Sequence, residues 1–107
     1  MNAPPKTLPL IAGIPNHYGY QILELFQPLR KGTSLILFGS RAKGNYREGS
    51  DIDIAIKGTD ITPKDRDQWL LKYETLHLPW KLDLVIYHHI KEHALIEHIN
   101  RAGIPIL

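Results

Sequence analysis

Residues 38–57 read FGSRAKGNYREGSDIDIAIK, and the other segments of the chain can be placed around them. Within this stretch Asp51 and Asp53 alternate with isoleucines, in the two-residue period that a β-strand imposes on its side chains. The two carboxylates therefore share one face of a predicted strand, roughly 6.6 Å apart at about 3.3 Å per residue. Carboxylates this close repel each other unless a cation lies between them, and Mg²⁺ prefers oxygen ligands of this kind. The pattern predicts a magnesium site on Asp51 and Asp53.

The residues before the aspartates are suited to binding an anion. Gly39 lets backbone N–H groups approach an anion without a Cβ in the way, and Ser40 adds a hydroxyl donor. If a helix begins here, its first N–H groups are free to bind the same anion. Arg41 and Lys43 add positive charge beside the turn. We therefore expect Gly39, Ser40, Arg41 and Lys43 to contact the phosphates of a ligand.

The composition is that of an ordinary globular chain. Its 107 residues suffice for one core without a second lobe. The absence of cysteine excludes disulfides, zinc–thiolate sites and a cysteine nucleophile. No apolar run is long enough to cross a membrane or to serve as a signal peptide, and a net charge of +2 is too small to indicate nucleic-acid binding. We expect a cytoplasmic protein that contacts neither membrane nor nucleic acid directly.

The first third of the chain is predicted to be an arm, a helix and a strand. Residues 1–15 contain four of the eight prolines and are expected to be an irregular arm, followed by a single domain over 16–107. Asn16 can cap a helix that runs to about residue 31, where Gly32 ends it. Its core-facing positions are Ile22, Leu25, Phe26 and Leu29. Residues 33–38 read as a strand buried on both faces.

The pairing of the predicted strands places a third aspartate near the first two. If residues 33–38 pair antiparallel with the aspartate strand, the Gly39 turn lies at the end of the sheet where that strand begins. A helix over residues 62–76 follows, with Thr62 as N-cap, and leads to a strand over 80–87. A strand–helix–strand crossover of this length normally joins parallel strands, so Asp83 is expected beside Asp53.

The last segments complete the predicted fold. Residues 90–102 form a further amphipathic helix that ends at Gly103, and residues 104–107 can add a short edge strand. One antiparallel and one parallel pairing make a mixed sheet, flanked by helices. The expected fold class is therefore α/β (α+β).

The stretch GSRAKGNYREGSDIDIAI resembles the G-S-x-A-R-G…S-D-x-D motif of the DNA polymerase β-like nucleotidyltransferase superfamily. Within it, the stretch is similar to minimal nucleotidyltransferases, which are antitoxins paired with HEPN-domain toxins. Lys43 stands where the motif usually has arginine, which would remove bidentate recognition of a phosphate. The resemblance implies that catalysis and metal binding rest on Asp51, Asp53 and Asp83, and nucleotide binding on Gly39, Ser40, Arg41 and Lys43.

The resemblance also implies a reaction and a partner. The reaction is Mg²⁺-dependent transfer of AMP from ATP to a tyrosine hydroxyl of the toxin, an all-helical ribonuclease. Two alternatives stay open at the level of sequence. The chain could transfer a nucleotide to a small molecule with the help of a helical partner subunit, or it could be a non-catalytic antitoxin that sequesters its partner.

Overall fold

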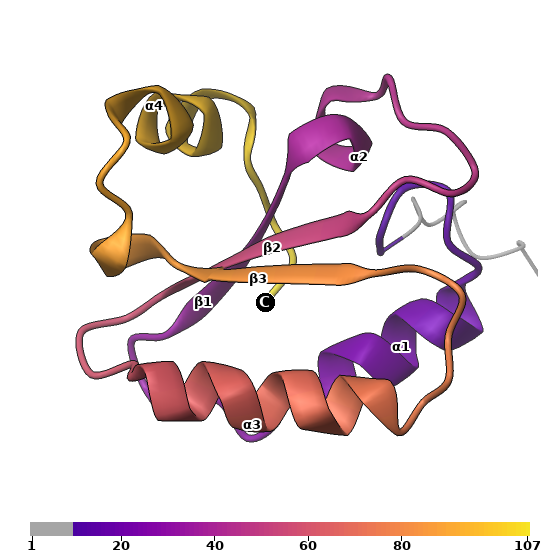
Figure 1. The fold of residues 1–107 in the computed structure, drawn as a ribbon, viewed down its shortest axis with the longest axis horizontal. Coiled ribbons are helices and arrows are strands. Elements are labelled where there is room, and N and C mark those ends of the chain that lie inside the picture. The colour runs from indigo at the N-terminus through magenta and orange to yellow at the C-terminus, as the bar shows by residue number, and fades with distance from the viewer. Residues whose placement is uncertain (1–9) are drawn as a thin grey trace, which may run out of the picture.

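The computed structural model describes residues 10–107, so most of the irregular arm expected over residues 1–15 lies outside it. Residues 10–15 contain no helix or strand, in keeping with that expectation, but Ile11 and Ile14 are buried in the core. This segment therefore packs as part of the domain. The helices are α1 (Asn16–Glu24), α2 (Gly39–Lys43), α3 (Pro63–Glu74) and α4 (His93–Ala102), and a 3₁₀ turn covers Tyr87–His89. The strands are β1 (Ser34–Phe38), β2 (Ile52–Lys57), β3 (Leu82–Ile86) and β4 (Ile104–Pro105) (Figure 1).

The four strands form one mixed sheet in the order β3-β2-β1-β4. Strand β2 pairs antiparallel with β1 and parallel with β3, as the sequence predicts. The predicted edge strand at the C-terminus is also confirmed, because β4 pairs antiparallel with β1. The expected α/β class with a mixed sheet is therefore correct.

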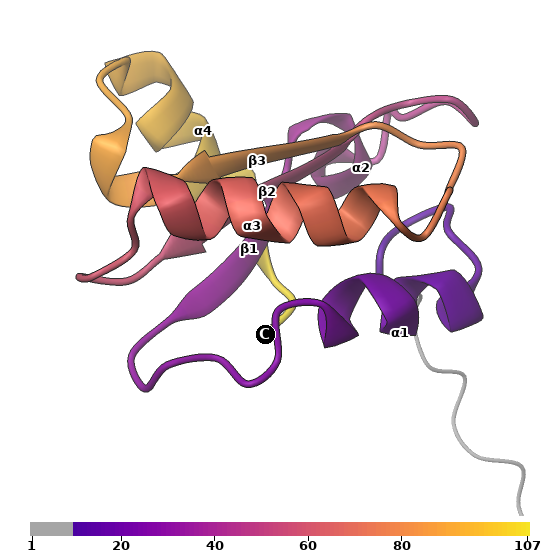
Figure 2. The same cartoon turned by 60° about the horizontal axis from the view of Figure 1, so that its bottom comes forward.

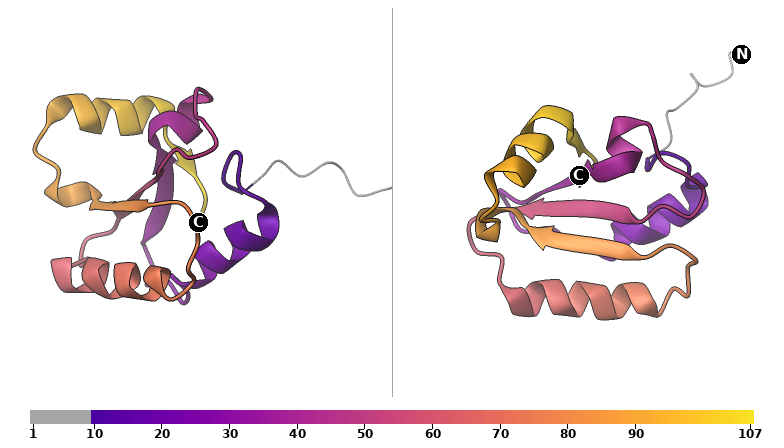
Figure 3. Two further views of the ribbon diagram at one scale, coloured as in Figure 1. Left: turned by 45° about the vertical axis from the view of Figure 1, so that its right-hand side comes forward. Right: turned by 45° about the horizontal axis from the view of Figure 1, so that its top comes forward.

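Helices cover both faces of the sheet, but unequally (Figures 1 and 3). Helices α1 and α3 lie together on one face, where they bury the isoleucines of β2 in the larger hydrophobic cluster (Figure 2). On the other face α4 packs over a smaller cluster that includes Phe38, Ala55 and Ile99. Burying a large aliphatic side chain contributes about 1.5–3 kcal/mol, so the first face supplies most of the stability. The aspartates of β2 and β3 belong to the second, thinner face.

Helix α1 differs from its prediction. It ends at Glu24, seven residues before the predicted end, and Asn16 does not cap it. The Asn16 side-chain oxygen instead accepts the N–H of Leu10, which ties the segment before the helix to its first turn. Pro28 lacks an N–H and disfavours helical backbone at the residue before it, so a helix through this position would be interrupted. The predicted core positions nevertheless face the interior: Ile22 and Phe26 are buried, and Leu25 and Leu29 pack against them.

The later helices follow their predicted signals more closely. Helix α3 begins with a capping box, in which the Thr62 hydroxyl accepts the Asp65 N–H at 3.2 Å and the Thr62 N–H donates to the Asp65 carboxylate at 2.9 Å. The helix ends at Glu74, close to the predicted end. Helix α4 begins at His93, later than predicted, because residues 90–92 are an extended connection from the 3₁₀ turn. Within residues 10–107, no helix is long and apolar enough to span a membrane.

Candidate functional site

Two aspartates meet on the thinner face of the sheet. The register of the parallel pair places Asp53 of β2 directly beside Asp83 of β3, as the crossover predicts. Asp53 is half-buried, whereas Asp83 is exposed. Burial, the negative charges of Asp83 and Asp51, and hydrogen bonding to Asp83 together raise the pKa of Asp53 to about 6. The protein thus holds two carboxylates together against their repulsion, which suits a site that receives a cation.

Gly39 allows the Asp53 carboxylate to take this position. The Gly39 backbone has a φ of +73°, in the left-handed region that favours glycine. A Cβ at Gly39 would overlap the Asp53 carboxylate and lie 2.9 Å from its carbon Cγ. The end of β1 and the start of β2 therefore fit together only because residue 39 has no side chain. Glycine is needed here for space as well as for conformation.

The Gly39 N–H is used inside the protein. The predicted helix after the turn is present as the five-residue α2, and the first N–H groups of a helix have no acceptor within it. His98 of α4 supplies an acceptor: its Nε2 receives the Gly39 N–H at 3.0 Å. Sequence reasoning missed His98, because 59 residues separate the two partners and no local pattern links them. Ser40, the next residue in the turn, is half-buried. Because the Gly39 N–H is already bonded to His98, Ser40 is the remaining predicted phosphate contact of the turn.

Arg41 has a different environment from the one that its predicted role requires. Its side chain is only 1% exposed, although we expected it to contact a phosphate. The guanidinium donates to the carbonyls of Ala12, Glu48 and Ser50, the shortest of these bonds being 2.6 Å. It also lies over the Tyr46 ring, 5.1 Å from the centroid. Arg41 therefore joins the segment before α1 to the loop between α2 and β2, and burial lowers its pKa.

Two other predicted site residues, Asp51 and Lys43, do not complete a ligand-binding group with the Asp53–Asp83 pair. Asp51 is exposed just before β2, and Lys43 is exposed in the last turn of α2. In the described part of the chain, no three His, Asp or Glu side chains are grouped closely enough to hold a metal ion. Asp53 and Asp83 are therefore the donor pair that the structure brings together. Participation of Asp51 as a third ligand stays a prediction.

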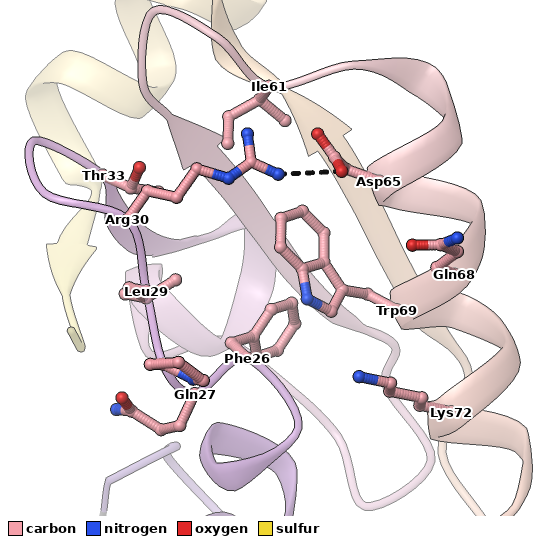
Figure 4. A pocket seen from close by; sticks show the side chains of 11 residues that line it. Phe26, Gln27, Leu29, Arg30, Thr33, Ile61, Asp65, Gln68, Trp69 and Lys72 are labelled. Atoms are coloured by element: carbon pink, nitrogen blue, oxygen red, sulfur yellow. Dashed lines mark ion pairs between the residues drawn. The ribbon is translucent and has the colours of Figure 1, made fainter.

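The aspartates lie on an open face and do not line the hollow beside the Arg30–Asp65 ion pair. That hollow has a volume of about 210 Å³ and lies between α3 and the connection from α1 to β1 (Figure 4). Its rim carries the ion pair of Arg30 and Asp65, with 2.8 Å between nitrogen and oxygen. None of the predicted site residues lines it. A ligand on the aspartates would therefore remain accessible from one side.

This combination of a mixed sheet, paired carboxylates and a Gly-Ser turn agrees with a comparison against protein families. The model of the polymerase beta nucleotidyltransferase family matches residues 20–107, and the chain belongs to this family. The match spans the turn and all three aspartates. No curated protein sequence matches the chain significantly.

Solved structures with the same fold include toxin–antitoxin complexes. A chain of a toxin–antitoxin bound to AMP-PNP superposes with a TM-score of 0.65 and 23% identity, over 82% of this chain and 71% of that one. A chain of the MntA–HepT toxin–antitoxin gives a TM-score of 0.61 and 20% identity, over 87% and 72% of the two chains. At these identities the similarity establishes the fold.

Proposed function

We propose that this protein is a Mg²⁺-dependent nucleotidyltransferase that acts as an antitoxin, transferring AMP from ATP to a tyrosine hydroxyl of a cognate HEPN ribonuclease toxin. The observation that carries the proposal is the pairing of Asp53 and Asp83 beside the Gly39 turn. The similarity in fold to toxin–antitoxin complexes, one of them with AMP-PNP, supports an adenine nucleotide as donor and a toxin as partner. Because a ribonuclease toxin acts on RNA in the cell interior, we place the antitoxin in the cytoplasm.

The donor set fits a magnesium ion. Burial and the neighbouring Asp83 charge raise the pKa of Asp53, and a divalent cation would relieve the repulsion between the two adjacent carboxylates. In the proposal Asp51, Asp53 and Asp83 hold Mg²⁺, which when bound neutralises charge on the phosphates and on the leaving pyrophosphate. Ser40 and Lys43 donate to the terminal phosphates. Arg41 acts through the loop that it holds, and in this proposal it does not contact the phosphates.

The transfer forms one bond and breaks one. The acceptor oxygen attacks the α-phosphorus of ATP, the bond from that phosphorus to the oxygen of pyrophosphate breaks, and pyrophosphate leaves. The proton of the hydroxyl passes to a carboxylate, for which Asp83 is suited because it is exposed toward an incoming acceptor. The open face beside the aspartates leaves room for a partner protein to present its tyrosine and to complete the site.

A binding experiment tests the nucleotide and metal part of the proposal. Mg²⁺ and ATP together should raise the melting temperature more than either alone, since a ligand at a hundredfold excess over its Kd adds about 2.7 kcal/mol to stability. Asp53→Asn keeps the shape of the side chain and removes its charge, so this variant should lose the joint effect. An equal joint effect in the wild type and in Asp53→Asn would contradict the assigned site.

Co-expression with the partner tests the transfer itself. The wild-type protein should add the mass of AMP to the toxin and restore growth. Asp83→Asn should still bind the toxin, because Asp83 is exposed and supports no packing, but it should leave the toxin unmodified and toxic. Full protection by Asp83→Asn with an unmodified toxin would instead favour neutralisation by sequestration. Nucleotide transfer to a small molecule, with no change in the toxin's mass, would favour the other alternative.

A further inference from the structure

The His98 imidazole is the feature of the site that the proposed reaction does not yet use. It lies on α4, far from the motif in sequence, and its Nε2 accepts the Gly39 N–H at 3.0 Å. A neutral imidazole that accepts at Nε2 carries its proton on Nδ1. The ring is half-buried and meets Phe38 edge-on, with 6.2 Å between the ring centroids. Contacts with two consecutive residues, Phe38 and Gly39, therefore hold the imidazole against the turn.

The hydrogen bond acts on the peptide unit between Phe38 and Gly39. The orientation of this unit depends on the ψ of Phe38, which is −168°, and on the φ of Gly39, which is +73°. A change in the Phe38 ψ that the Gly39 φ does not offset would turn the N–H away from His98 and would move the Gly39 Cα relative to the Asp53 carboxylate that packs against it. The contact of His98 with the turn and the contact of the turn with Asp53 are thus mechanically linked.

We propose that His98 is a positioning residue of the nucleotide site: by accepting the Gly39 N–H, it fixes the turn so that Ser40 and the Asp53 carboxylate face the same ligand. The inference rests on the proposed nucleotide-binding function for its effect on ATP. It also changes the role of Gly39, whose amide binds His98 instead of a phosphate. Gly39 contributes its conformation and its lack of a side chain, and Ser40 provides the direct phosphate contact.

Three variants separate a hydrogen-bond acceptor from simple packing. His98→Leu fills much of the same space but cannot accept the Gly39 N–H. His98→Gln places an acceptor oxygen at about the reach of Nε2 and should retain the bond. His93→Leu is the matched control, since this histidine lies exposed on the same helix. All three are compared with the wild type at pH 8, above the pKa of about 6 of Asp53.

Two measurements are made on each protein: the exchange rate of the Gly39 amide without nucleotide, and the Kd of ATP with Mg²⁺ by calorimetry. One neutral hydrogen bond corresponds to a change of roughly 3- to 10-fold. His98→Leu should speed Gly39 exchange and raise the Kd by such factors, while His98→Gln and His93→Leu stay near the wild type. Unchanged Gly39 exchange in His98→Leu overturns the inference. So does a His98→Gln variant as impaired as His98→Leu, or an unaltered Kd in His98→Leu.

The two proposals fail in different ways. If the wild type does not bind ATP with Mg²⁺ at all, the proposed function is wrong, and with it the effect of His98 on a nucleotide. The amide exchange still shows in that case whether His98 holds the turn. If the wild type binds ATP and the His98 variants do so equally well, the proposed function stands and the positioning role is wrong.

Discussion

Replacing Gly39 by alanine tests the central contact of the site. The new Cβ would overlap the Asp53 carboxylate and would sit on a backbone with a φ of +73°. The left-handed conformation costs a residue with a side chain roughly 1–2 kcal/mol, and forcing an atom into an occupied space costs typically about 1–3 kcal/mol more. We expect Gly39→Ala to lower the free energy of unfolding by about 2–5 kcal/mol, measured by urea denaturation. It should also abolish the joint stabilisation by Mg²⁺ and ATP.

Gly44 provides the matched control, because it has a φ of +89° and nothing lies within 4 Å of an added Cβ. Gly44→Ala should therefore pay only the conformational part, about 1–2 kcal/mol. The clash can also be isolated in a double-mutant cycle, since Gly39→Ala should cost less in an Asp53→Ala background. Equal costs of Gly39→Ala and Gly44→Ala, or a cost independent of residue 53, would refute the reasoning.

Three further predictions concern charge and burial. At pH 8, Asp53→Asn should raise the free energy of unfolding by about 1–2 kcal/mol, after allowance for solvent screening. Near pH 4, the variant and the wild type should be equally stable. The sign follows because the folded pKa of about 6 lies above the ordinary aspartate value of 3.8, so wild-type stability falls as the pH rises through this window. An effect that does not depend on pH would contradict this reasoning. Asp83→Asn should lower the pKa of Asp53, which carboxyl NMR titration can follow, and an unmoved pKa would mean that the two groups do not interact. Arg41→Ala should lower the free energy of unfolding by about 2–4 kcal/mol, because buried carbonyls lose a charged donor. The exposed control Lys43→Ala should change it by less than about 0.5 kcal/mol. Similar urea midpoints for the two variants would count against the structural role of Arg41.

Several features follow from the sequence because neighbouring residues determine them. The alternation of aspartate and isoleucine in β2 sets which side chains share a face, whatever packs against the strand. The Thr62 N-cap depends on residues within one turn and is present as predicted. The position of Asp83 beside Asp53 follows from the preference of strand–helix–strand units for parallel pairing, together with the similar places of the two residues in their strands.

The end of α1 shows that a local apolar pattern can predict burial correctly and the helix boundary wrongly. The apolar spacing continues past Glu24 and predicts helix to residue 31, and those apolar residues do face the core. The chain reaches the same burial without a continuous helix, because Pro28 interrupts the hydrogen-bond ladder and tertiary packing holds the segment. Burial patterns alone therefore located the side chains correctly and the helix boundary wrongly.

What only the tertiary structure decided is how each polar group of the motif is used. From the sequence, Arg41 is one of several basic residues beside a turn, yet in the fold its donors meet carbonyls from two separate segments. The acceptor of the Gly39 N–H comes from α4, and the raised pKa of Asp53 comes from burial and from Asp83 across a strand pair. Hydrogen-bond partners and local dielectric depend on contacts between distant parts of the chain, and no local sequence pattern encodes them. The sequence by itself placed Asp53 and Asp83 side by side on one face of the sheet, whereas packing determined that Arg41 is buried and that the Gly39 N–H is bonded to His98.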